Sequence, residues 1–207
     1  MKIAVITDHS GKEELMAQGL LENVQVEWLD EPVTLNGTDG YIDLLFNPGK
    51  ERVDLLRGFS PAIVIINSVT TGLDGLPENF IRINGWPTFL KRAVVEASGQ
   101  NAEIKKRAEN IFACFSKKTA WVPDVPGFIS ARVVSMIINE AYFALEEEVS
   151  NKDEIDTAMK LGTNYPYGPF EWSEKIGLKK VYQLLAVLAE TNSRYEPCTL
   201  MKKEMAG

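Results

Sequence analysis

The chain has 207 residues, of which 45% are hydrophobic and 25% are charged, and its formal net charge is −7. This composition is typical of an ordinary globular protein with enough residues for one or two domains. The acidic balance argues against a nucleic acid or an acidic membrane as a partner.

The two cysteines, Cys114 and Cys198, are far apart in the sequence, and we expect both to be free thiols in a reducing compartment. No Cys/His cluster has the spacing of metal ligands, so no metal site is predicted. Neither a signal peptide nor a transmembrane segment is visible, and no membrane association is expected. These features together predict a cytoplasmic protein.

The first 123 residues alternate between strand-like and helical patterns. The predicted strands cover residues 2–7, 24–29, 41–46, 62–67, 80–84, 92–97 and 119–122. The predicted helices cover residues 13–21, 51–57 and 101–115. Such alternation favours a largely parallel sheet, and a short apolar strand at the start is typical of a doubly wound α/β domain.

From Asp124 onward the pattern is helical, so the chain is predicted to be α/β followed by all-α, with domains at 1–123 and 124–207. Pro126 and Gly127 allow a sharp bend, after which residues 128–145 are apolar on most sides of a predicted helix. A second helix should begin with Ser150 or Asn151 as its cap and run to Leu161, with Gly162 just beyond its end. A rigid aromatic loop at 165–170 and a further turn at 173–177 follow.

Several segments of this half carry a family resemblance. They are Asp124-Val125-Pro126-Gly127-Phe128-Ile129, Arg132, Asn139-Glu140-Ala141, residues 155–162, Gly168-Pro169-Phe170-Glu171 and Arg194-Tyr195-Glu196-Pro197. In this order and spacing they resemble the C-terminal domain of the 3-hydroxyacyl-CoA dehydrogenases, including the 3-hydroxybutyryl-CoA dehydrogenases. The resemblance implies oxidation of a 3-hydroxyacyl-CoA to a 3-oxoacyl-CoA in fatty acid metabolism, with NAD as cofactor.

The resemblance also implies a Rossmann-like first domain and a homodimer formed through the helical domain. Fewer residues precede Tyr41 here than precede the matching strand in the family, so the nucleotide-binding domain is expected to be reduced. The apolar surplus of residues 128–145 independently favours a second copy of the chain as the partner.

The turn after the first strand departs from a dinucleotide-binding turn, which needs several glycines near the pyrophosphate. It contains only Gly11, the one candidate cofactor-binding residue, and Asp8 puts a carboxylate where phosphates would lie. The alternative interpretation is a tight turn in which Ser10 or Asp8 caps the following helix.

The family resemblance further implies a His base held by a Glu, together with a Ser and an Asn. Glu96 matches the Glu, and Thr70 or Thr71 could retain the hydroxyl. Asn84 or a neighbour stands where the His is expected, and Ala131 replaces the Asn. The candidate catalytic residues are therefore Glu96 and Thr70, without a base between them.

These departures predict a dehydrogenase relative with impaired or lost catalysis. One alternative is an active short-chain 3-hydroxyacyl-CoA dehydrogenase with a remodelled site, for which His9, the only histidine, is the candidate base. Another is a non-enzymatic dimeric binding protein for an acyl-CoA or another small ligand, with Asp8, His9 and Glu96 as polar groups.

Overall fold

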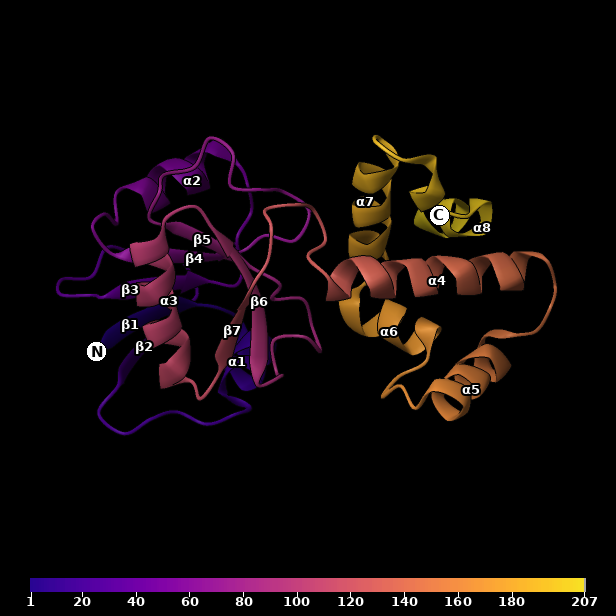
Figure 1. Cartoon of the computed structure of the whole chain (residues 1–207), viewed down its shortest axis with the longest axis horizontal. Coiled ribbons are helices and arrows are strands. Elements are labelled where there is room, and N and C mark those ends of the chain that lie inside the picture. The colour runs from indigo at the N-terminus through magenta and orange to yellow at the C-terminus, as the bar shows by residue number, and fades with distance from the viewer. Residues whose placement is uncertain (207) are drawn as a thin grey trace. The chain divides into compact units, whose positions relative to one another are not determined.

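A computed structural model describes residues 1–206, which form two compact units, Met1–Phe128 and the residues from Ile129 onward. The first unit contains a seven-stranded sheet in the order β2-β1-β3-β4-β5-β6-β7 (Figure 1). Its strands are β1 Lys2–Ile6, β2 Gln25–Leu29, β3 Gly40–Asp43, β4 Ile63–Asn67, β5 Phe80–Ile83, β6 Val94–Gly99 and β7 Lys118–Trp121. Every neighbouring pair is parallel except β5 and β6, so the predicted largely parallel α/β sheet is confirmed.

Three helices cover the two faces of this sheet, namely α1 His9–Met16, α2 Lys50–Arg57 and α3 Ala102–Cys114. Leu15 of α1 and Phe112 of α3 belong to the same apolar cluster as Ile3 and Ile65. Leu56 of α2 packs with the residues that point to the opposite face. Alternating strand residues therefore supply two separate cores, as expected of a strand with both faces buried.

The helix predicted at 13–21 begins earlier and ends earlier than expected. Asp8 has an extended backbone and its side chain accepts from the Gly11 amide, so α1 starts directly after the first strand. The chain leaves the helix after Met16 and reaches Gly19 with a positive φ of 96°. The predicted start was too late because the helix was placed at its first apolar residues and not directly after the Asp8 cap.

The second unit is helical, which confirms the predicted all-α character of this part of the chain. Its elements are α4 Ser130–Glu146, α5 Lys152–Thr163, α6 Pro169–Ile176, α7 Leu178–Ala189, the 3₁₀ turn η1 Ser193–Tyr195 and α8 Thr199–Ala206. Helix α4 packs against α6, α7 and α8. Within residues 1–206, no helix has the length and apolar character needed to cross a bilayer.

Local signals set the ends of these helices. The Asn151 side chain accepts from the Glu154 amide, which confirms one of the two predicted caps of α5. The same helix continues to Thr163, two residues beyond the predicted end, and Asn164 instead of Gly162 adopts the left-handed conformation that follows it, with φ 56°. Pro169 begins α6, and the predicted aromatic loop is therefore partly helical.

Candidate functional site

The candidate site lies at the carboxyl edge of strands β1 to β5. Strand β1 leads through α1 to β2, whereas its neighbour β3 leads through α2 to β4 on the opposite face of the sheet. The direction in which successive strands are added to the sheet thus reverses between β1 and β3, although the two strands are parallel. In open α/β sheets, ligands bind outside the carboxyl ends of the strands at such a reversal.

The turn between β1 and α1 is closed by its own side chains. The Asp8 carboxylate accepts a hydrogen bond of 2.8 Å from the Gly11 amide. A Cβ atom on Gly11 would lie 2.3 Å from Thr7 Oγ1, so the glycine allows the helix to pack closely on the end of the strand. His9 lies in the first helical turn, 87% exposed, with its Nε2 3.2 Å from Glu13 Oε1.

A buried ion pair joins the ends of β2 and β3, and the sequence analysis missed it. Asp43 is fully buried and accepts two bonds from Arg52, at 2.8 and 2.9 Å, while a third guanidinium nitrogen donates to Glu31 at 2.8 Å. Burial raises the pKa of Asp43, and the Arg52 guanidinium opposes that rise. The hydrogen bond to Asp43 raises the pKa of Arg52 in turn. A carboxylate inside an apolar strand was the signal that could have indicated a buried partner.

Asn84 and Glu96 meet where β5 ends against the antiparallel β6. Asn84 is 3% exposed, and its Nδ2 donates to Glu96 Oε2 at 3.1 Å. The Asn84 amide also donates to the Glu96 carbonyl at 3.0 Å, so the backbone fixes the pair. Arg82, which lies on β5 two residues before Asn84, forms an ion pair with Asp124.

The segment between Asn84 and Glu96 is held by two side chains that sequence reasoning did not select. Glu14 of α1 accepts a bond of 2.6 Å from the Thr88 amide. Lys117 is buried and donates to the carbonyls of Leu90 at 2.7 Å and Arg92 at 3.0 Å. Burial lowers the pKa of Lys117 to about 8.

Thr70 lies in the loop after β4, which Arg82 organises. Arg82 is fully buried and donates to the Ser68 carbonyl at 2.9 Å, and its partner Asp124 accepts from the Leu73 amide at 2.8 Å. Thr70 is half-buried and forms no hydrogen bond with Asn84 or Glu96 within the described part of the chain. The structure therefore pairs Glu96 with Asn84 and leaves Thr70 in a separately supported loop.

Comparison with known proteins shows which proteins this chain is similar to. Residues 127–206 match the family described as 3-hydroxyacyl-CoA dehydrogenase, C-terminal domain. The (S)-3-hydroxybutyryl-CoA dehydrogenase of Ralstonia eutropha has the same fold, with a TM-score of 0.77, 19% identity and coverage of 99% of this chain and 93% of that one.

Sequence relatives agree with this comparison. The 3-hydroxyadipyl-CoA dehydrogenase of Escherichia coli K12 is 43% identical over 89 residues, or 42% of this chain and 19% of that protein. The 3-hydroxybutyryl-CoA dehydrogenase of Bradyrhizobium diazoefficiens is 35% identical over 132 residues, or 61% of this chain and 45% of that protein. Residues 127–206 thus resemble the C-terminal domain of the 3-hydroxyacyl-CoA dehydrogenases in sequence. The chain spans less than half the length of these two relatives.

Proposed function

We propose that this chain is a member of the 3-hydroxyacyl-CoA dehydrogenase family in which NAD-dependent oxidation of 3-hydroxyacyl-CoA is absent or very weak. The observation that carries the proposal is the Asn84 amide bonded to Glu96 at 3.1 Å. Oxidation of a hydroxyl by hydride transfer needs a group that accepts the hydroxyl proton, and a carboxamide cannot do so near neutral pH. Loss of a general base typically lowers the rate by about 10² to 10⁴.

The cofactor turn supports the same proposal. The pyrophosphate of a dinucleotide needs free amides at a helix N-terminus and a glycine backbone close by. Here the Asp8 carboxylate already accepts from the Gly11 amide and would repel the phosphates. These residues do not fit NAD in the family manner. Because base loss and cofactor loss affect different steps, their effects should multiply to a first approximation.

The function that remains is binding and assembly, and we propose a homodimer formed through the helical unit. Ile129 and Val133 lie four residues apart at the start of α4, and they are 59% and 51% exposed. Ile137 continues this face and is half-buried. Covering these apolar side chains with a second copy would remove them from water. The dimer would be a binding protein for an acyl-CoA or another small ligand.

An active short-chain dehydrogenase with a remodelled site is the competing function, and it would need another base. His9 is the only imidazole in the sequence. Its side chain is largely in solvent beside Glu13. If the enzyme is active, replacing His9 by alanine must abolish the rate.

The test is a spectrophotometric assay of NADH oxidation with acetoacetyl-CoA, run on the wild-type chain and on Asn84→His. Asn110→His is the control, because it adds an imidazole at an exposed position of α3. We expect wild-type turnover at least about 100-fold below the usual median near 10 s⁻¹. Wild-type turnover within about tenfold of that median would refute the proposal.

Thermal unfolding with and without NADH separates the two parts of the argument. A ligand that binds the native state must raise the melting temperature. We expect no rise for the wild-type chain. Suppose instead that NADH raises the melting temperature of the wild-type chain, and that Asn84→His, but not Asn110→His, increases the rate of NADH oxidation. The missing base would then account for the whole defect, and the argument that Asp8 prevents cofactor binding would be contradicted.

A further inference from the structure

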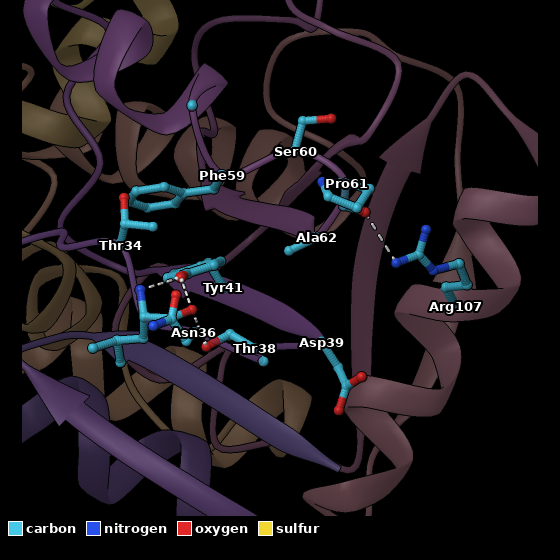
Figure 2. Close-up of a pocket in the computed structure, with 13 residues that line it drawn as sticks. Thr34, Asn36, Thr38, Asp39, Tyr41, Phe59, Ser60, Pro61, Ala62 and Arg107 are labelled. Atoms are coloured by element: carbon cyan, nitrogen blue, oxygen red, sulfur yellow. Dashed lines mark hydrogen bonds between the residues drawn. The ribbon is translucent and has the colours of Figure 1, made fainter.

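A cavity of about 320 Å³ opens at the amino ends of β3 and β4. Figure 2 shows its walls, which come from residues 34–39, residues 58–62 and Arg107 of α3. Strands β3 and β4 are parallel, so this cavity lies at the edge of the sheet opposite the Asn84–Glu96 pair. It is therefore separate from the candidate site at the carboxyl edge, and its size is within the range of small-molecule pockets.

The sequence builds this cavity through one glycine and one aromatic pair. A Cβ on Gly40 would lie 2.3 Å from Ile111 Cδ1, so the glycine lets α3 lie against the start of β3. Arg107 is one turn before Ile111 on the same helix and thereby reaches the cavity. Tyr41 stacks on Phe59 with ring centroids 4.1 Å apart, and both are buried beneath it.

Hydrogen bonds from Tyr41 fix the loop that forms one wall. Its hydroxyl accepts from the Leu35 amide at 2.8 Å and lies 3.3 Å from the Leu35 carbonyl. The Thr38 hydroxyl donates to the same carbonyl at 3.1 Å. The wall is held before any ligand arrives, which lowers the ordering cost of binding.

The half-buried Arg107 is the cation of the cavity. Its Nη2 donates to the Pro61 carbonyl at 3.1 Å, as drawn in Figure 2. Among residues 1–206 no carboxylate lies within ion-pair distance of this guanidinium. A guanidinium has five N–H donors in a planar fork, so most of them remain for an external acceptor.

The acidic side chain that lines the cavity is already engaged elsewhere. Asp39 accepts from the Lys2 amide at 2.8 Å, and the Lys2 ammonium donates to the Asn36 carbonyl at 3.2 Å. The Lys2 side chain therefore lies near the same loop and brings a second positive charge to it. Arg107 and Asp39 both line the cavity, but among residues 1–206 they form no ion pair with each other.

We propose that this cavity binds a small hydroxylated organic anion, either a carboxylate or a phosphate ester. Its acidic group would sit on the Arg107 guanidinium, which matches both groups in a two-pronged geometry. Thr34, Asn36 and Ser60 line the cavity and present hydroxyl and amide groups for the rest of the molecule (Figure 2).

Isothermal titration calorimetry with D-ribose 5-phosphate and with L-malate tests the proposal, and neutral D-ribose is the comparison ligand. We expect saturable binding of at least one acid and none of ribose. Arg107→Gln should weaken binding at least about tenfold, because it removes charge-assisted hydrogen bonds. Arg57→Gln is the matched control, because Arg57 also donates to a backbone carbonyl, that of Gly75 at 2.9 Å, outside this cavity.

A second variant keeps the test decisive if Arg107→Gln does not fold. Asn36→Asp adds a carboxylate to the same cavity on an exposed loop, and it should weaken binding of either acid. Circular dichroism establishes that each variant is folded before titration. The proposal is overturned if neither acid binds the wild-type chain up to about 10 mM. It is equally overturned if binding survives both variants unchanged.

Discussion

Replacing Lys117 by methionine should change how stability depends on pH, because the structure holds this ammonium away from water. Lys117 is 3% exposed and donates to the carbonyls of Leu90 and Arg92. Burial lowers its pKa from 10.5 to about 8. Between these two values the unfolded chain binds a proton that the folded chain lacks, so the Lys117 contribution to stability rises with pH in this window. Below about pH 8 Lys117 is protonated in both the folded and the unfolded chain, and the folded chain bears the full free-energy cost of burying the ammonium.

The size of the effect follows from the separation of the two pKa values. Each pH unit is worth about 1.36 kcal/mol, so the contribution gains about 2 kcal/mol between about pH 7.5 and pH 10. Other groups act in the opposite direction, because burial raises the pKa of Cys114, Cys198 and Tyr142. These groups remain in the variant, and the difference between wild type and Lys117→Met isolates the lysine.

Urea unfolding followed by tryptophan fluorescence measures this difference at the two pH values. The free energy of unfolding of the wild type, relative to that of Lys117→Met, should increase by about 2 kcal/mol between the two pH values. Lys118→Met is the control, because it removes the same charge from the exposed neighbour of Lys117. A constant difference for Lys117→Met would refute the burial argument. It would also remove Lys117 as the clamp on the segment that precedes Glu96.

Two further predictions concern the proposed dimer and the buried ion pair. Ile137→Asp should dissociate a dimer formed through α4, because it places a carboxylate in the apolar face. If light scattering finds the wild type to be a monomer at micromolar concentration, that dimer is excluded. Asp43→Ala should destabilise the fold by about 3 kcal/mol in urea unfolding, because it leaves Arg52 with a 16% exposed side chain and no buried partner. Glu31→Ala, at a 79% exposed position, should cost less than about 1 kcal/mol. Equal losses from the two variants would contradict this ranking.

The strands and most helices could be predicted because their signals are local. Apolar runs such as residues 62–67 are buried on both faces of the sheet, and the observed β4 lies within that run. The start of α1 was missed by four residues, although Asp8 had been considered as a cap. Helix boundaries depend on which of several capping residues the chain uses, and tertiary packing decides among them.

Within the candidate site, the contact between Asn84 and Glu96 could be expected because these two residues follow a fixed spacing. Glu96 and Asn84 lie 12 residues apart, and an antiparallel turn of the sheet brings them together as the family spacing suggests. Arg52 and Lys117 carry no such signal, because their partners are set by the packing of distant elements. A charged residue in a polar stretch of sequence does not reveal that folding will bury it.

The two edges of the sheet differ in how many of their polar groups are already hydrogen-bonded within the chain. At the carboxyl edge, Asn67 donates to the carbonyls of Leu44 and Gly85 and accepts from the Gly85 amide at 3.0 Å. The Asp8 carboxylate likewise already accepts a hydrogen bond from the Gly11 amide of the first helix.

A ligand at that edge would have to replace hydrogen bonds that the chain already makes, so much of its own bonding energy would be cancelled. At the amino edge, Arg107 donates one hydrogen bond to the Pro61 carbonyl and lines a preformed cavity. An acceptor arriving there adds bonds and displaces only water. The proposed ligand site therefore lies at the edge opposite to the one used in dinucleotide-binding folds.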